Sequence, residues 1–332
     1  MSRPFISIII PARNEEQFIG KSLRSIFNSD YPREYYEIIV VDGMSEDKTI
    51  DIINKFKVKY DNLKLLRNPK KITPVARNLG VKAARGDYIM IFDAHSTAPK
   101  DYIQKCVEHI TETGADNVGG IVCTVPRENT LKGRVIARIL SSEFGVGGSK
   151  FRIGATKPEE VDTVPFGFYR RNVFDRIGYF NENLIRNQDI EFNLRLKRAG
   201  GKILLFPDIQ LVYLSRSTFK SFWKNNFLNG FWVIYSSKFA DTPFSIRHLI
   251  PFFFLIFLIT GGLLAFVGKF FMFSYFTILG FYFLLDILFS LKIARKERNI
   301  KAFFLALFGF ISLHISYGLG SLIGFLKLGG KK

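Results

Sequence analysis

Three long apolar stretches near the C-terminal end of the chain constrain its structure more than any other feature. They cover residues 249–267, 270–291 and 303–326, and the first contains no charged residue. Each is long enough to cross the roughly 30 Å hydrocarbon core of a bilayer as an α-helix. We therefore expect a transmembrane region at 248–332 with about three spans.

Basic residues beside these stretches predict the orientation of the chain in the membrane. The connection between the second and third stretches carries five of them: Lys292, Arg295, Lys296, Arg298 and Lys301. Because basic connections stay on the cytoplasmic side, we expect this connection and the chain before residue 249 in the cytoplasm. A third crossing would leave Lys327, Lys331 and Lys332 outside, which the same rule disfavours. The third stretch either crosses despite this or is re-entrant, and we expect that it crosses.

Polar groups inside the apolar stretches, and aromatic groups before them, fit a membrane setting. Asp286 and His314 are expensive in lipid, so we expect them to pack against helix neighbours or to reach the headgroups. Residues 216–247 are rich in aromatic and basic side chains such as Trp223 and Lys224. This composition predicts amphipathic helices in the membrane interface, although a core helix of a soluble domain is the alternative.

The charge of the chain restricts its partners. Its 332 residues carry a formal net charge of +18, and most of the charged residues precede the apolar stretches. Such a surface suits nucleic acid, an anionic membrane, or anionic substrates such as nucleotide-sugars and lipid phosphates. Cys106 and Cys123 are the only cysteines, so neither a disulfide framework nor a zinc site is expected. A strand begins near Phe5 with no signal peptide before it, which predicts a cytoplasmic N-terminal domain.

Strands and helices alternate along the N-terminal part of the chain. Four apolar runs indicate strands, at residues 5–10, 37–42, 63–66 and 88–93, and helical patterns separate them. This alternation predicts a parallel, Rossmann-like α/β sheet. The Gly-x-Gly-x-x-Gly fingerprint is absent after the first strand, so a nucleotide is not expected to bind as in dehydrogenases. The Gly- and Arg-rich residues 127–158 predict a mobile loop over a site, or else a surface insertion.

Candidate ligand-binding residues follow the expected strands. Asp42 ends the second strand, and Asp93 and His95 close the fourth. Ligands of open α/β sheets bind outside the carboxyl ends of the strands. A carboxylate and an imidazole two residues apart on an extended chain face the same way and can hold a divalent cation. The alternative is a solvated acid beside a hydrogen-bonding histidine. Asp189 lies near the start of a further helix, where the helix dipole favours a carboxylate.

Five motifs occur in a fixed order: Pro11-Ala-Arg13-Asn14-Glu15, Val41-Asp42-Gly43, Ala76-Arg77-Asn78, Asp93-Ala-His95 and Gln188-Asp189. In this order they resemble family 2 glycosyltransferases with a GT-A fold, over roughly residues 5–235. Segments 114–120, 161–167 and 186–189 are similar to membrane-anchored glucosyltransferases of bacterial exopolysaccharide assembly, of the succinoglycan type. The resemblance implies a multi-pass enzyme of the cell membrane that serves polysaccharide biosynthesis, with a cytoplasmic catalytic domain at 1–215.

The resemblance also implies roles for individual residues. Six would bind the nucleotide-sugar: Pro11, Arg13 and Glu15 in the nucleotide pocket, Asp42 at the base or ribose, Arg77 at the diphosphate, and Asp93 through a divalent metal. Asp189 would be the catalytic base. General chemistry agrees, because an inverting transfer needs one base and positive charge on the leaving diphosphate. A retaining double displacement would also need a nucleophile, and Glu191 is expected to be a helix-surface acid instead.

The sequence departs from the family pattern at two positions. His95 replaces the second acid of the Asp-x-Asp motif, and imidazole suits softer metals than Mg²⁺. We therefore expect Asp93 and His95 to bind Mn²⁺ or Mg²⁺, with Mn²⁺ supporting activity at least as well. Gln188 replaces the acid before Asp189, which leaves Asp189 as the only strong candidate base in that motif.

The predicted reaction moves one sugar from a nucleotide-sugar, UDP-linked before GDP-linked, to a polyprenyl-diphosphate-linked glycan. A polyprenyl-phosphate glycosyltransferase is the first alternative, and its phosphate acceptor needs no base. A processive polysaccharide synthase comes third, because the Gln/Arg-x-x-Arg-Trp motif of such enzymes is not intact in Phe222–Trp232. A silent membrane scaffold and a nucleic-acid-binding protein are both disfavoured, and no nucleic acid partner is expected.

Overall fold

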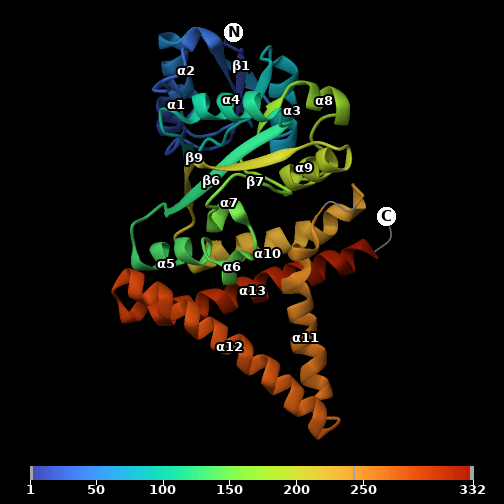
Figure 1. Ribbon diagram of the computed structural model, residues 1–332. Helices are drawn as coiled ribbons and strands as arrows, with labels where there is room; N and C mark the ends of the chain where they lie inside the picture. The colour runs from blue at the N-terminus through green and yellow to red at the C-terminus, as the bar shows by residue number, and fades with distance from the viewer. Residues whose placement is uncertain (1–2, 242–243, 330–332) are drawn as a thin grey trace. The chain divides into compact units, whose positions relative to one another are not determined.

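The computed structural model describes residues 3–241 and 244–329, which form two compact units (Figure 1). The first unit comprises the chain up to Cys123 together with Gly154–Tyr213. The second comprises Thr124–Ile153 and the chain from Leu214 onward. This division reflects packing, so the expected interfacial and transmembrane boundaries at residues 216 and 248 stay predictions.

One sheet of nine strands organises the first unit. Its strands are β1 (Ile6–Ala12), β2 (Tyr36–Asp42), β3 (Leu63–Arg67), β4 (Tyr88–Ile91), β5 (Ser96–Thr97), β6 (Asn117–Pro126), β7 (Glu159–Glu160), β8 (Phe168–Arg170) and β9 (Ile203–Ser215). The helices are α1 (Ile19–Phe27), α2 (Thr49–Lys59), α3 (Thr73–Ala83), α4 (Tyr102–Thr113), α8 (Asn172–Ile177) and α9 (Gln188–Arg198), with a 3₁₀ turn η1 at Arg33–Tyr35. The strand order is β3-β2-β1-β4-β8-β6-β9-β5, and β7 pairs with β9.

The predicted alternation of parallel strands and helices is confirmed. β3, β2, β1 and β4 are neighbours and run parallel to one another. Ile8, Ile9 and Val40 are fully buried, as expected for parallel strands that are covered on both faces. β8 then pairs antiparallel with both β4 and β6, which the residue pattern did not predict. β4 ends earlier than expected because the chain turns after it, with the Ser96 N–H donating to the Asp93 carbonyl at 3.1 Å.

A buried acid fastens the amino ends of β1 and β2. The Glu37 side chain is fully buried and accepts hydrogen bonds from Ser7 Oγ (2.6 Å), the Arg85 N–H (2.9 Å) and Lys64 Nζ (2.8 Å). Burial alone would raise the pKa of this carboxyl, but these hydrogen bonds bring the pKa below its ordinary value. The ionised group therefore ties three segments together at the edge of the sheet opposite to the strand carboxyl ends.

Helices dominate the second unit. They are α5 (Leu131–Ile139), α6 (Glu143–Val146), α7 (Lys150–Ile153), α10 (Phe219–Tyr235), α11 (Ile250–Leu264), α12 (Lys269–Glu297) and α13 (Ile300–Leu328), with 3₁₀ turns η2 (Ser236–Lys238) and η3 (Ile246–Leu249). The prediction of a loop at residues 127–158 is wrong, because α5, α6 and α7 occupy just over half of this stretch. Its place over a site stays a prediction. α5 forms there because Thr130 caps its first turn, accepting from the Gly133 N–H at 3.1 Å.

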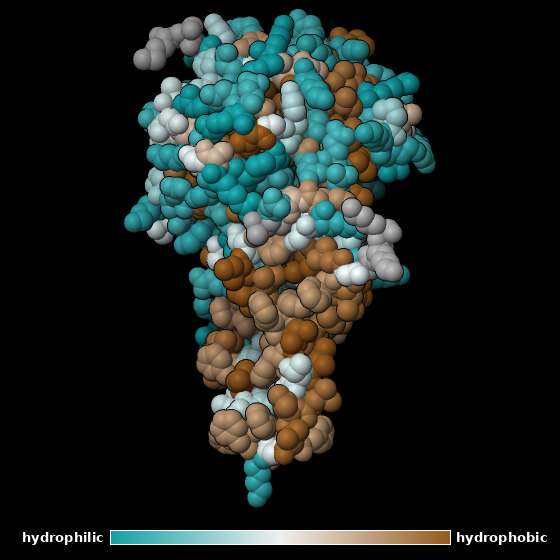
Figure 2. All heavy atoms as spheres, turned by 90° about the vertical axis from the view of Figure 1, so that its right-hand side faces the viewer, coloured by the Kyte–Doolittle hydropathy of each residue, from teal (hydrophilic) through white to brown (hydrophobic). Residues whose placement is uncertain are grey.

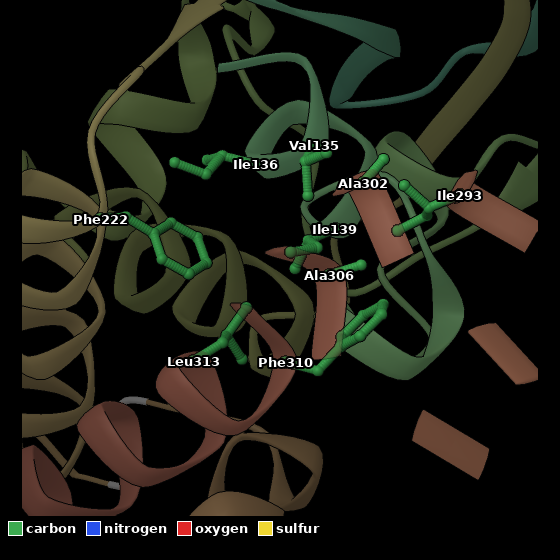
Figure 3. Close-up of a cluster of buried hydrophobic side chains, with 9 residues drawn as sticks. All are labelled: Val135, Ile136, Ile139, Phe222, Ile293, Ala302, Ala306, Phe310 and Leu313. Carbon is green, nitrogen blue, oxygen red and sulfur yellow. The ribbon is translucent and has the colours of Figure 1, made fainter. Parts of the chain in front are cut away.

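An apolar cluster joins four helices of the second unit (Figure 3). Its buried members are Val135, Ile136 and Ile139 of α5, Phe222 of α10, Ile293 of α12, and Ala302, Ala306, Phe310 and Leu313 of α13. Because these residues are far apart in sequence, the cluster fixes α5 and α10 against α13.

Three helices of the described chain are long and apolar enough to cross a membrane: Ile246–Leu264, Lys269–Glu297 and Ile300–Leu328. Large apolar side chains are exposed on the first two of these helices, among them Leu263 and Phe270. Figure 2 shows mostly hydrophobic residues, in brown, at the lower end of the molecule, where Figure 1 shows α11 and α12. How many of the three helices cross stays a prediction.

The two ionisable residues predicted to lie inside the apolar stretches make contacts within the protein. His314 lies between Tyr282 and Phe144, with Nδ1 2.9 Å from the Tyr282 hydroxyl and Nε2 2.9 Å from the Phe144 carbonyl oxygen. Asp286 is fully buried and accepts from Ser290 Oγ at 3.1 Å. The expected packing role is therefore confirmed for His314, which contacts a neighbouring helix.

Candidate active site

The carboxyl ends of β1, β2 and β4 lie side by side at one edge of the sheet. Ala12 is opposite Asp42 in the β1–β2 register, and Ile9 is opposite Ile91 in the β1–β4 register. These strand ends and the loops after them carry six of the predicted site residues: Pro11, Arg13, Glu15, Asp42, Asp93 and His95. The parallel topology therefore brings this set to one edge, where ligands of such sheets bind.

Hydrogen bonds fasten the loop after β1 to the loop after β2. Five of them are Asn14 N–H to Ser45 Oγ (2.9 Å), Glu15 N–H to Thr49 Oγ1 (2.8 Å), Glu16 N–H to Asp47 Oδ2 (3.1 Å), Glu46 N–H to Asn14 Oδ1 (2.9 Å) and Lys48 N–H to Glu16 Oε2 (3.1 Å). Asn14 has a φ of 53°, a left-handed conformation that asparagine tolerates better than most residues. The paired loops hold the exposed Arg13 and the half-buried Glu15 beside the strand ends.

Asp42 anchors the turn that follows β2. Its side chain is 1% exposed, and Oδ2 accepts from the Ser45 N–H at 3.0 Å while Oδ1 accepts from Ser45 Oγ at 2.5 Å. Gly43 comes next, and a Cβ there would lie 3.1 Å from the Cβ of Arg13. The structure thus gives Asp42 a positioning role in the loop, and its contact with a base or ribose stays a prediction.

His95 lies between two carboxylates. Its Nδ1 is 3.3 Å from Glu15 Oε1, and its Nε2 is 4.0 Å from Asp93 Oδ2. All three side chains are about a quarter exposed or less, with values of 21% for His95, 20% for Glu15 and 28% for Asp93. Among the residues that the structure describes, no three His, Cys, Asp or Glu side chains form a ready metal cluster. Asp93 and His95 therefore offer at most part of a coordination shell, which a ligand's oxygens would have to complete.

Arg77 carries a buried positive charge on α3. Its side chain is 9% exposed, and its guanidinium carbon lies 5.3 Å from the centre of the Phe180 ring. Its Nε is buried without a hydrogen-bond partner in the described chain. The next residue, Asn78, holds the Phe180 backbone by donating to its carbonyl oxygen at 2.9 Å and accepting from its N–H at 3.0 Å. A buried donor without a partner lowers the stability of the fold unless a ligand accepts its hydrogen bond. An anionic ligand at Arg77 would fit the predicted diphosphate contact.

Asp189 lies in the first turn of α9. Its Oδ1 accepts from the Ile190 N–H at 3.0 Å, and the side chain is half-buried. The pKa of the buried Tyr169 phenol depends on the charges around it. Burial raises the pKa of Tyr169, the charge of Asp189 raises it further, and the charge of Arg77 lowers it. Asp189 and Arg77, far apart in sequence, therefore both lie within electrostatic reach of one buried hydroxyl.

A buried polar network supports this region, and sequence reasoning missed it. Asn193, fully buried one turn after Asp189, accepts at Oδ1 from Asn117 Nδ2 (3.0 Å) and from the Tyr169 hydroxyl (3.1 Å). Its Nδ2 donates to Thr163 Oγ1 at 2.8 Å. The available signal was an asparagine four residues after Asp189, which places both on one helix face. The network fixes the helix that carries Asp189.

Glu191 is buried rather than on the helix surface, which corrects the expectation. It is 7% exposed, and its two carboxylate oxygens accept from Arg195 Nε (2.8 Å) and Nη2 (2.9 Å). Arg195 also donates to the carbonyl oxygens of Ile177 and Tyr179. The acid is buried because Arg195, one turn further along α9, neutralises it, and this pairing gives Glu191 a structural role.

Comparison with known proteins places these features in a family. The model of glycosyl transferase family 2 matches residues 7–178. A Methanococcus voltae protein named dolichyl N-acetyl-α-D-glucosaminyl phosphate 3-β-D-2,3-diacetamido-2,3-dideoxy-β-D-glucuronosyltransferase is 35% identical, covering 79% of this chain and 84% of its own. The succinoglycan biosynthesis protein ExoA of Rhizobium meliloti is 32% identical over 63% of this chain and 63% of its own length.

A solved structure shares the fold. The mannosyltransferase PcManGT from Pyrobaculum calidifontis, solved with GDP-Man and Mn²⁺, aligns with a TM-score of 0.66. The alignment covers 97% of this chain and 88% of that one, at 18% sequence identity. At this identity the likeness concerns the fold, and it agrees with the predicted GT-A architecture followed by C-terminal helices.

Proposed function

The chain belongs to glycosyl transferase family 2 and is a glycosyltransferase, and we propose that it moves one sugar from a nucleotide-sugar to a glycan carried on a polyprenyl lipid. The observation that carries this proposal is the buried Nε of Arg77, which has no hydrogen-bond partner in the described chain. The charges of Arg77 and Asp189, which both act on the pKa of the buried Tyr169, support it. A buried guanidinium with an unused donor suits a diphosphate, and a carboxylate suits an acceptor hydroxyl. A UDP-sugar is the favoured donor, and a GDP-sugar is the second choice.

Two side chains carry the proposed chemistry. Asp189 takes the proton of the acceptor hydroxyl as that oxygen attacks the anomeric carbon. The bond between the anomeric carbon and the diphosphate oxygen breaks, and its electron pair leaves with the nucleoside diphosphate, whose charge Arg77 stabilises. This single displacement inverts the anomeric centre. Glu191 is already engaged by Arg195, so α9 offers no second carboxylate for a retaining mechanism.

Asp93 and His95 would hold a divalent cation beside the diphosphate. The Glu15 carboxylate near Nδ1 of His95 supports this role, because a proton held on Nδ1 by that carboxylate would leave Nε2, 4.0 Å from Asp93 Oδ2, as the nitrogen that binds the ion. When bound, such an ion would neutralise negative charge on the two phosphates. A donor set that mixes imidazole with carboxylate suits Mn²⁺ at least as well as Mg²⁺.

The second unit and a relative support the proposed acceptor and location. The Methanococcus voltae relative is named for transfer to a sugar on dolichyl phosphate, which supports a lipid-linked acceptor here. Apolar helices long enough to cross a membrane support a place in the cell membrane. The basic connection 292–301 supports a cytoplasmic catalytic unit.

The proposal is tested by measuring nucleoside diphosphate release in detergent. UDP- and GDP-sugars are offered with Mn²⁺ or Mg²⁺, together with either polyprenyl phosphate or a sugar linked to polyprenyl phosphate or diphosphate. Release that requires the lipid-linked sugar, with a product longer by one sugar, supports the proposal. Release with polyprenyl phosphate alone would instead identify a polyprenyl-phosphate glycosyltransferase, and long products would identify a processive synthase.

A further inference from the structure

The helices α10 and α13 pack side by side along most of the length of α10. A side chain at Gly320 of α13 would overlap the Phe227 carbonyl oxygen of α10, and a Cβ at Gly324 would lie 2.6 Å from the Phe231 carbonyl oxygen. Ser321 Oγ donates to the Gly230 carbonyl oxygen at 3.1 Å. Glycines let the two backbones meet directly, so α10 and α13 form one rigid pair.

α10 runs parallel to the part of α13 that begins near Phe308. Near the start of α10, the Phe219 ring lies 5.0 Å from the Phe308 ring of α13. Towards the end of α10, the Lys327 ammonium lies 5.7 Å from the centre of the Phe231 ring. Figure 1 shows both helices lying across the open end of the α11–α12 hairpin. Whatever depth in a membrane α10 occupies, α13 must share it.

α10 is too polar to occupy the hydrocarbon core. Within 17 residues it contains five strongly polar side chains: Lys220, Lys224, Asn225, Asn226 and Asn229. In the first half of α13, a Cβ at Gly309 would overlap the side chain of Ile139 of α5, so α5 packs closely against α13 there. α5 is also polar on one side, where Arg134 Nε (2.6 Å) and Arg138 Nε (3.1 Å) bind Glu297 at the end of α12. Because α5 and α10 are both polar and both pack on α13, we expect all three helices to lie in the interface between the bilayer and water.

The surface of α13 differs from those of the other two apolar helices. In its apolar stretch of 18 residues, 44% of the residues are buried within the protein, against 6% in the corresponding stretch of the helix that includes α11 and 17% in that of α12. Ile300, Phe304 and Phe308 are exposed, and their spacing of four residues makes one apolar stripe. A helix with one face buried in the protein and one apolar stripe exposed suits the membrane–water interface better than the hydrocarbon core, where lipid would surround it.

We propose that α13 does not cross the membrane, and that α5, α10 and α13 form a platform in the cytoplasmic membrane interface. Only the hairpin of α11 and α12 enters the bilayer. The partner of the exposed stripe is then the lipid surface. This arrangement keeps Lys327, and with it Lys331 and Lys332 beyond the described residues, on the same side as the connection 292–301, as the positive-inside rule favours. Lys269 at the hairpin tip is then the one basic residue of the hairpin turn on the opposite side. The chain would then cross the membrane twice, and not three times as the sequence predicted.

Cysteine labelling in sealed membrane vesicles tests the platform with the full-length chain. The background carries Cys123→Ser, because Cys123 is exposed whereas Cys106 is buried. Single cysteines replace Gly268 at the hairpin tip and Gly329 after α13, and a Cβ meets nothing within 3.8 Å at either position. Val58→Cys, at a site 91% exposed on α2, marks the side of the catalytic unit. A membrane-impermeant maleimide is applied to vesicles of each orientation, and a single symmetrical peak in size-exclusion chromatography in detergent shows that each variant is folded.

The platform predicts that Gly329→Cys is labelled from the same side as Val58→Cys, and Gly268→Cys from the opposite side. Labelling of Gly329→Cys together with Gly268→Cys, from the side opposite to Val58→Cys, would overturn the proposal and restore a third crossing. Labelling of Gly268→Cys from the Val58 side would overturn it as well, because the hairpin would then not cross. None of these outcomes depends on which sugar or acceptor the enzyme uses.

Discussion

The carboxylate of Glu15 lies 3.3 Å from Nδ1 of His95, and Nε2 of the same ring lies 4.0 Å from Asp93. Glu15 comes from the loop after β1, whereas the other two residues follow β4. The contact therefore couples two motifs of the predicted site. It supports the proposed cation site, because a carboxylate on one ring nitrogen of a histidine would orient the other nitrogen towards a bound cation.

Replacing Glu15 by glutamine is expected to weaken Mn²⁺ binding by about 10-fold or more, since loss of an outer carboxylate typically costs that much. The measurement is calorimetric titration of Mn²⁺ in the presence of UDP, which needs no turnover. Glu34→Gln, at an exposed acid in η1, is the matched control and should leave the affinity unchanged. An unaltered Mn²⁺ affinity in Glu15→Gln would show that His95 does not depend on this carboxylate.

Arg77→Met is expected to separate stability from donor binding. Without nucleotide, the melting temperature should stay the same or rise, because the variant removes a buried donor that has no partner. With Arg77 at the diphosphate, as proposed, UDP should raise the melting temperature of the wild type but not that of the variant. Differential scanning calorimetry with and without UDP measures both effects. A clearly lower melting temperature without nucleotide would mean that Arg77 serves the fold and not the ligand.

Asn193→Leu is expected to lower kcat by about 10-fold or more while KM for the donor changes little, because the helix start that carries Asp189 loses its support. Buried groups of Asn117, Thr163 and Tyr169 would also lose their partner, at about 1–3 kcal/mol of stability. Asn193→Asp keeps the oxygen that accepts from two of them and should restore part of kcat. Steady-state kinetics decide the matter, with the exposed Asn54→Leu on α2 as control. A proportional change in kcat and KM would argue against positioning.

Glu37 makes stability depend on pH in a definite direction. Its folded-state pKa lies below the unfolded value of about 4.3, because the hydrogen bonds from Lys64, Ser7 and Arg85 outweigh burial. A lowered folded pKa contributes stability above the unfolded pKa, and that stability is lost as the pH falls towards the folded pKa. The wild type should therefore lose stability between about pH 5 and pH 3 more steeply than Glu37→Gln. Urea unfolding of both proteins at pH 7, 5, 4 and 3 would show this, and parallel curves would contradict it.

Much of the fold could be predicted because its signals are local. Ile8, Ile9 and Ile10 form an unbroken β-branched run, as is typical of a buried parallel strand. Because such runs alternate with helical patterns, the parallel half of the sheet could be predicted from the sequence. The edge that gathers Asp42 and Asp93 also followed, because parallel strands end together. Patterns of this kind need no knowledge of distant partners.

Other features depend on partners that are far away in sequence. Asn193 is polar and was not singled out from the sequence, and its burial becomes clear only once Asn117 and Tyr169 lie beside it. α5 was not predicted, because it lies in a Gly- and Arg-rich stretch. Its apolar residues form a core only by packing against α13. The hydropathy of α13 is the same for a helix in lipid and for one packed on α10, so composition alone could not reveal its neighbours.

The most direct test of the central claim is single-turnover sugar transfer by Asp189→Asn to a lipid-linked sugar. If Asp189 is the base, the rate of nucleoside diphosphate formation should fall by about 100-fold or more. Donor affinity, measured by calorimetry, should stay close to that of the wild type, because Arg77 and the loops after β1 and β2 are intact. Asp175→Asn, at an exposed acid on α8, should react at the wild-type rate. Transfer by Asp189→Asn at a rate near that of the wild type would contradict a base-assisted inverting mechanism at this residue.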